Sequence, residues 1–130
     1  MLDVARRLAA PPGAVWDTLI NTAVWPQWGP SVRRATIDHG GTRLQADSTG
    51  RVQTAVGFWF RFRVTEWEEG RRWAWKVAGI PATAHRVEPI AGASATSLGI
   101  MEIPNWAPFY APLCWVALGK VGGVTDRQAR

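Results

Sequence analysis

Two side chains in this sequence have the chemistry to move a proton inside a binding site, and His85 is the first. Thr83, His85 and Val87 are spaced by two, so a strand there places all three on one face. Imidazole titrates near neutral pH, which suits a general acid or base. Buried histidines also serve as hydrogen-bonded core residues, so a catalytic and a structural role both stay open.

Glu102 is the second proton-transfer candidate. It follows Thr96, Leu98 and Ile100 at a spacing of two, so we expect a carboxyl group at the end of an inward-facing row. Burial would raise the pKa of this carboxyl group, whereas a position at the strand end would let it reach solvent. Tyr110, the only tyrosine, could donate its hydroxyl to a bound carbonyl or lie at the surface.

Other site chemistries have little support in the sequence. His39 and His85 are the only histidines and lie in separate segments, and Cys114 is the only cysteine, so we expect no metal site and no disulfide. Gly40-Gly41 is followed by neither a lysine nor a helix start, which argues against a phosphate loop. Cys114 lies in an apolar helical stripe and is expected to be a core residue. We therefore expect no cofactor.

The clearest structural pattern is an alternation of apolar and polar residues over 58–67, which predicts a strand. After a turn at 68–71, residues 72–77 repeat the pattern and predict its hairpin partner. The side chains expected to face inward are Phe58, Phe60, Phe62, Val64, Trp73, Trp75 and Val77. Trp59 and Trp67 are expected to point to the opposite face. Two neighbouring strands would thus present a row of aromatic rings on one surface.

The remaining elements follow from apolar periodicity and from glycine and proline positions. Further strands are predicted at 2–8, 32–38, 43–48, 51–56, 82–89 and 94–103, with a helix at 12–20 and a brief helical turn after Asn21. A last helix is predicted from Pro108 to Gly122, where Gly122-Gly123 should end it, followed by a frayed tail at 125–130. This order is typical of an α+β fold with an antiparallel sheet.

Length and composition predict one domain over residues 1–130. Of the 130 residues 47% are hydrophobic and 19% charged, a balance that allows a sizeable core. The net charge of +5 comes from scattered arginines and not from a basic helix, so we expect a solvated sheet face and no nucleic-acid partner. The sequence shows neither a secretory signal nor an apolar run long enough for stable membrane insertion, so we expect a cytoplasmic protein.

Four short motifs, in order along nearly the whole chain, resemble the START-like (Bet v 1-like, SRPBCC) superfamily. They are Ala-Pro-Pro-Gly-Ala-Val-Trp-Asp at 10–17, Trp-Pro-Gln-Trp at 25–28, Val-Thr-Glu-Trp at 64–67 and Arg-Arg-Trp-Ala-Trp at 71–75. The sequence is most similar to the polyketide cyclase/dehydrase-type branch. The resemblance implies a helix-grip fold, with an antiparallel six- or seven-stranded sheet wrapped around a C-terminal helix and two short helices after the first strand. Members bind lipids, sterols or polyketides, and only some are enzymes.

The leading functional hypothesis is therefore binding of a hydrophobic aromatic, polyketide-like or lipid-like molecule in a cavity between the sheet and the C-terminal helix. The residues expected to line it are Trp25, Trp28, Phe58, Phe60, Phe62, Trp73, Trp75, His85, Leu98, Ile100, Phe109 and Leu113. The alternative is a polyketide cyclase, aromatase or dehydratase that uses His85 or Glu102 as acid or base. A third hypothesis is an interaction module that presents Trp59 and Trp67. The sequence leaves monomer and homodimer open.

Overall fold

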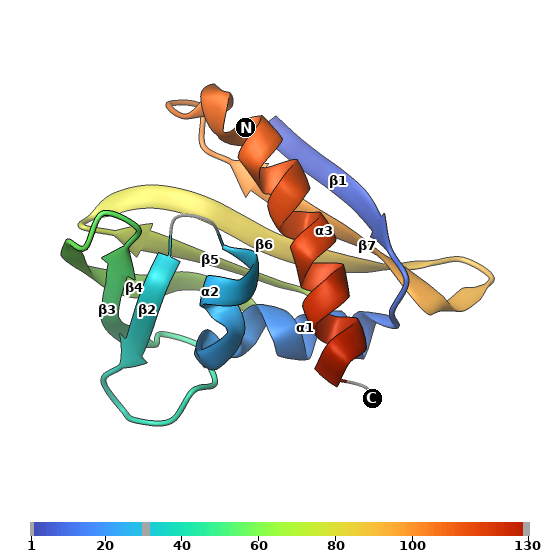
Figure 1. The fold of residues 1–130 in the computed structure, drawn as a ribbon, viewed down its shortest axis with the longest axis horizontal. Helices are drawn as coiled ribbons and strands as arrows, with labels where there is room; N and C mark the ends of the chain where they lie inside the picture. Colours follow the sequence, from blue (N-terminus) through green and yellow to red (C-terminus); the bar gives the residue numbers. More distant parts are fainter. Residues whose placement is uncertain (1, 30–31, 129–130) are drawn as a thin grey trace.

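The computed structural model describes residues 2–29 and 32–128, and a seven-stranded antiparallel sheet forms its main layer (Figure 1). The strands are β1 Leu2–Leu8, β2 Val32–Ile37, β3 Thr49–Thr54, β4 Trp59–Glu68, β5 Arg72–Val77, β6 Ile80–Ile90 and β7 Ala93–Ile103. Their order across the sheet is β1-β7-β6-β5-β4-β3-β2. Between β1 and β2 lie α1 Pro12–Ile20, the short 3-10 turn η1 Thr22–Val24 and α2 Trp25–Trp28; η2 Pro108–Tyr110 leads into α3 Ala111–Gln128. This is the expected α+β helix-grip arrangement.

The C-terminal helix α3 lies across the sheet on the side of β1 and β7 and also contacts α1 and α2 (Figure 1). The close approach of α3 to the sheet depends on a glycine, which has no side chain. A methyl group added at Gly99 of β7 would lie 2.9 Å from Leu8 Cδ1 and 3.0 Å from Leu118 Cδ2. Interiors are packed too tightly to absorb such a group without displacement, so Gly99 sets how near α3 can come to the sheet.

The helix α3 is longer than its glycines predict. The sequence places its end at Gly122, but the helix continues to Gln128, and residues 125–128 of the expected tail are helical while 129 and 130 lie outside the described residues. Val121 and Val124 on either side of the glycine pair are buried, and Thr125 Oγ1 lies 2.6 Å from Thr18 Oγ1 of α1. Tertiary packing of the last turns thus outweighs the low helix propensity of glycine.

The segment 43–48, predicted as a strand, is a loop with one isolated bridge between Asn21 and Arg43. The following strand is β3 at 49–54 and not 51–56. The backbone N–H of Gln45 donates to Ser48 Oγ at 2.7 Å, and Asp47 has a φ of 61°. Local side-chain hydrogen bonding and a left-handed residue make a turn here, a signal that the apolar pattern hid.

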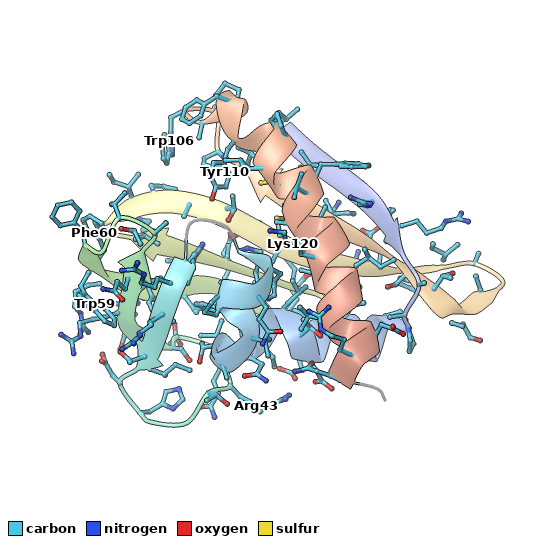
Figure 2. The ribbon with its side chains drawn as sticks, viewed as in Figure 1. Arg43, Trp59, Phe60, Trp106, Tyr110 and Lys120 are labelled. Carbon is cyan, nitrogen blue, oxygen red and sulfur yellow. The ribbon has the colours of Figure 1, made fainter. Side chains whose placement is uncertain are left out.

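The strand β4 contains a bulge that reverses the expected direction of Trp67. Its pairing with β5 shifts register between Val64 and Glu66, so the side-chain alternation changes phase there. Trp67 then faces inward and makes an edge contact with Trp16 of α1, with ring centroids 5.3 Å apart. The expectation that Trp67 lies on the outward face together with Trp59 is wrong. Trp59, the first residue of β4, precedes the bulge and is 42% exposed (Figure 2).

Candidate functional site

Three stacked rings lie at the centre of the concave face. Trp73 of β5 and His85 of β6 are direct cross-strand partners, and their rings stack at 4.2 Å with an interplanar angle of 20°. Trp25 of α2 covers the other side of Trp73 at 5.6 Å, nearly parallel at 7°. The indole N–H of Trp25 donates to the Leu19 carbonyl at 2.9 Å, which fixes the α2 ring over the sheet. Strand pairing and a helix therefore build one continuous aromatic stack.

A second set of rings surrounds the stack edge-on. Trp75 meets Trp25 and Trp73 at centroid distances of 5.4 and 5.5 Å, and Trp28 meets His85 at 5.8 Å. Phe62 packs behind Trp75 at 5.5 Å. Edge-to-face contacts of this kind are favourable beyond the area they bury. We call these mutually packed rings the aromatic wall: Trp25, Trp28, Phe62, Trp73, Trp75 and His85.

An inner chamber of about 50 Å³ lies between this wall and α3. It is lined by Trp25, Trp28, Gly29, Val32, Trp73, Trp75, Thr83, His85, Met101, Tyr110, Leu113, Cys114 and Ala117. The residues from η2 and α3 fall at i, i+3, i+4 and i+7, which is one face of a helix. The chamber thus lies between the sheet and the C-terminal helix, where the sequence predicts a cavity, although the aromatic rings fill much of the space between these two elements.

An outer chamber of about 280 Å³ adjoins the inner one, sharing Val32, Trp75, Thr83 and Tyr110. Its other lining residues are Val52, Thr54, Val77, Ala82, Pro104, Trp106, Ala107 and Phe109. The indole of Trp106 donates to the Pro81 carbonyl at 2.9 Å and so fastens the segment before α3 to the start of β6. Figure 2 shows Trp106 and Tyr110 beside the start of α3. This chamber is large enough for a small polycyclic molecule.

His85 is placed as predicted, on the inward face of β6 at the inner chamber. Burial lowers the pKa of its imidazole to about 3, so the ring is neutral at physiological pH. Its Nε2 lies 3.4 Å from Thr83 Oγ1, and its Nδ1 has no hydrogen-bond partner within residues 2–29 and 32–128. A general acid or base would change its protonation state near neutral pH, whereas His85 stays a neutral hydrogen-bonding group there.

Glu102 lies on the opposite face of the sheet from both chambers. Its carboxylate accepts two hydrogen bonds from Arg72, at 2.7 and 3.1 Å, and lies 3.6 Å from the guanidinium of Arg86. The hydrogen bonds from Arg72 lower the pKa of this carboxyl group, and burial opposes them only in part. The expected inward facing of Glu102 is therefore wrong, and of the two alternatives for its carboxyl group the buried acid with a raised pKa is contradicted.

The prediction for Glu102 failed because it assigned the wrong set of alternate β7 residues to the inward face of the sheet. Met101 pairs with His85 of β6 and shares its inward face, so Leu98 and Ile100 point outward with Glu102. Residues 98–103 carry apolar side chains on both faces, so alternation alone leaves two phases open. Ile100 is nevertheless buried on the outer face, where its strand neighbours are Ala5 and Arg86.

The ion pair gives a prediction for Glu102→Gln. We expect the substitution to lower the free energy of unfolding at pH 7 by about 1–3 kcal/mol, because it removes the carboxylate that accepts two hydrogen bonds from Arg72 and leaves that guanidinium only its ion pair with the exposed Glu66. The folded pKa of Glu102 lies below its usual 4.5, so its contribution is present above that pH and is lost as pH falls through the folded pKa. Urea denaturation at several pH values should show wild type and variant converging in acid. A constant difference at all pH values would contradict the ion-pair explanation.

The structure brings together about half of the residues predicted to line the cavity. At the inner chamber lie Trp25, Trp28, Trp73, Trp75, His85 and Leu113, and at the outer chamber lie Trp75 and Phe109. Phe58 and Phe60, around the start of β4, are 67% and 39% exposed and line neither chamber. Phe62 supports the wall from behind, and Leu98 and Ile100 lie on the other face.

Several lining residues were not predicted. Tyr110 was considered only as a hydroxyl donor to a bound carbonyl or as a surface residue, and it lines both chambers. Cys114 was expected to be a core residue and Ala117 was not among the expected lining residues, although the helical spacing of the three marks one face. Burial raises the pKa of the Cys114 thiol to about 11, so it stays protonated at the chamber. Val52 and Met101 carry no signal that separates a cavity residue from a core residue.

Neither a membrane span nor a metal cluster is visible in the described parts of the chain. No helix within residues 2–29 and 32–128 is long and apolar enough to cross a membrane. Within the same ranges, no three His, Cys, Asp or Glu side chains gather as metal ligands would.

Known structures share this architecture at low sequence identity. The Zhui aromatase/cyclase from a Streptomyces species has a TM-score of 0.70 and 13% identity, with 99% of this chain and 94% of that chain covered. XoxI from Bacillus cereus has a TM-score of 0.71 and 12% identity, covering 99% and 97%. A Nitrosomonas europaea protein has a TM-score of 0.64 and 16% identity, covering 98% and 95%. At these identities the likeness shows the fold alone.

The sequence comparisons are of two kinds. No curated protein sequence matches the chain significantly. A family profile described as polyketide cyclase / dehydrase and lipid transport matches residues 2–122, which is nearly the whole chain. The resemblance carried by the tryptophan motifs and the helix-grip sheet is thereby confirmed, and the chain belongs to the polyketide cyclase/dehydrase and lipid transport family.

Proposed function

We propose that this protein binds an apolar small molecule with an aromatic or polycyclic part in its two joined chambers. The observation that carries this proposal is the outer chamber of about 280 Å³, which is lined mainly by apolar side chains and continues into a rigid aromatic wall. Ligand sites are typically concave and apolar, with few polar groups. The family description, which includes lipid transport, supports the same class of ligand.

A second candidate is a cyclase or dehydratase acting on such a ligand. One observation favours it: Nδ1 of His85, which has no partner among the described residues, belongs to a ring at the inner chamber. The low pKa of this imidazole weighs against general acid catalysis at neutral pH. His85→Phe separates the two, because turnover of a polyketide-like substrate would vanish in an enzyme, whereas a carrier would keep most of its affinity for apolar probes.

The binding proposal can be tested by obstructing the outer chamber. Ala82 lines this chamber, and Ala82→Trp would place an indole in the space of the ligand. We expect the dissociation constant for N-phenyl-1-naphthylamine, a neutral fluorophore that brightens in apolar sites, to rise more than tenfold. Fluorescence titration measures it.

Ala95→Trp is the matched control, because Ala95 is exposed near the β6–β7 hairpin and lines neither chamber. This variant should bind the fluorophore as the wild type does. Undiminished binding by Ala82→Trp, or an equal loss in both variants, would place the fluorophore elsewhere and contradict the proposal.

A further inference from the structure

The side chains that expose the most apolar surface gather at one end of the molecule. It is the end of the sheet at which β2, β4 and β6 begin and β3, β5 and β7 finish, and where β7 leads on to η2 (Figure 1). Within residues 2–29 and 32–128, every large hydrophobic side chain that is more than half exposed belongs to this end: Val56, Phe58, Ile80, Trp106 and Phe109. We call this group the apolar end. Single exposed apolar residues are common, whereas a gathered set is typical of an interaction surface.

Two hairpin turns at opposite ends of the sheet show that neither the turns nor the core require this composition. The β4–β5 turn reads Glu-Glu-Gly-Arg at 68–71, whereas the β3–β4 turn reads Ala-Val-Gly-Phe at 55–58. Each turn contains a glycine with positive φ, Gly70 or Gly57, so the residues beside the glycine need not be apolar. The run 55–60 has no polar side chain, and all of it except Gly57 is exposed. Such a run is unfavourable in water unless something covers it.

The segments that form the apolar end contain no acidic residue. Residues 49–65, 77–87 and 103–125 include arginines and a lysine but neither Asp nor Glu. The Arg51 guanidinium of β3 lies 5.6 Å from the centre of the Trp59 ring, beside the turn. Arg34 of β2 pairs with Gln53, which in turn pairs with Trp59. The apolar end is therefore bordered by positive charge.

This positive charge is uncompensated, in contrast to the arginines on the other half of the outer sheet face. Arg34 and Arg51 are exposed, and neither takes part in an ion pair within residues 2–29 and 32–128. On β5 and β6, by contrast, Arg72 and Arg86 both contact the carboxylate of Glu102. The side of the sheet next to the apolar end is thus free to attract an anionic partner.

An anionic lipid bilayer matches both properties of this surface. Aromatic side chains favour the interface between lipid and water, and arginines near the bilayer gain from its negative surface potential. A second copy of the chain would bring Arg34 and Arg51 against like charges. A nucleic acid would match the arginines but would leave Val56 and Phe58 in water.

We propose that the apolar end docks reversibly onto the surface of an anionic bilayer. Val56 and Phe58 enter the headgroup region, and Arg34 and Arg51 lie against the lipid phosphates. Attachment at the interface depends on buried apolar area and on attraction to anionic lipids, and it needs no spanning helix. The inference does not rest on the proposed ligand binding, because Val56 and Phe58 line neither chamber.

The double variant Val56→Ser/Phe58→Ser tests the insertion. Sedimentation with vesicles of equal parts phosphatidylcholine and phosphatidylglycerol should show stronger binding of the wild type than sedimentation with phosphatidylcholine alone. The double variant should lose more than about tenfold of its partition coefficient for the mixed vesicles, because two apolar side chains no longer enter the interface. Without vesicles it should bind N-phenyl-1-naphthylamine as the wild type does, which shows that it is folded and keeps docking separate from ligand binding.

Arg51→Gln and Arg71→Gln form a matched pair that tests the location of the charge. Both remove one exposed arginine, but Arg71 lies in the β4–β5 turn at the opposite end of the sheet. Arg51→Gln should lower the partition coefficient for the mixed vesicles about fivefold, the usual effect of one arginine near an anionic surface. Arg71→Gln should leave it almost unchanged. Equal losses would mean diffuse attraction by net charge and would overturn the proposed surface.

Ile80 and Ile90, which begin and end β6, locate the contact in the wild type. Bicelles of the same lipid mixture with a gadolinium-chelate lipid should broaden the methyl signals of Ile80 in nuclear magnetic resonance spectra and spare those of Ile90. Failure to bind the mixed vesicles, or broadening of Ile90 alone, would overturn the inference. Dimers that Val56→Ser/Phe58→Ser abolishes, in a protein that does not bind vesicles, would assign the surface to a second copy and equally overturn it.

Discussion

Gly50→Ala is expected to lower the free energy of unfolding by about 3 kcal/mol, the largest single effect of so small a change in this sheet. A methyl group at Gly50 of β3 would overlap the backbone oxygen of Thr36 on β2 and would lie 2.8 Å from the Phe62 ring. A flexible side chain could move aside, but a neighbouring strand and a buried ring in the aromatic wall cannot do so cheaply. Urea denaturation measures the loss.

Gly13→Ala provides the contrast for this prediction. Gly13 lies in α1, and a methyl group there would meet nothing within 4 Å. Alanine is the better helix former, so this variant should be as stable as the wild type or more stable by up to about 1 kcal/mol. If Gly50→Ala were equally well tolerated, the close packing of Phe62 on β3 would be wrong.

The pH dependence of stability should carry the signature of His85. The folded imidazole has its pKa lowered to about 3, whereas an unfolded histidine titrates near 6.5. Between these values the unfolded chain binds a proton that the folded chain does not, so stability falls as pH falls through this window and is constant above it. The slope for one such proton is about 1.4 kcal/mol per pH unit.

His85→Phe removes this titration while keeping a ring against Trp73. Between pH 6 and 4 the free energy of unfolding of the wild type should therefore fall by about 2.5 kcal/mol more than that of the variant. Denaturant unfolding curves for both proteins across this range give the difference. Parallel pH profiles for the two proteins would mean that the imidazole is solvated and not buried in the stack.

The strand hairpin at β4 and β5 was predictable because its apolar alternation is strong, and its central rings face inward as expected. The same logic failed where the backbone breaks the alternation or where both faces are apolar. The bulge after Val64 turned Trp67 inward, and the apolar residues on both faces of β7 concealed that Glu102 belongs to the outer ion pairs. Periodicity alone records neither a register shift nor the choice of face.

The helix α3 shows a different limit of sequence reasoning. Glycines at 122 and 123 are strong local stop signals, but the helix continues because Val124 is buried and Thr125 contacts Thr18 of α1. Such contacts join residues more than a hundred positions apart. Likewise, that four tryptophan side chains line one chamber depends on how α2 folds back over β5, which no local pattern reports.

The most direct test of the central claim is to locate a bound probe by nuclear Overhauser effects. With N-phenyl-1-naphthylamine bound, we predict contacts to the methyl groups of Val52, Val77 and Ala82, all of which line the outer chamber. The exposed apolar side chains on the outside of α3, such as Val116, offer the competing surface. Contacts to Val116 without contacts to Ala82 would show that the fluorophore binds the surface and that the aromatic wall is simply core.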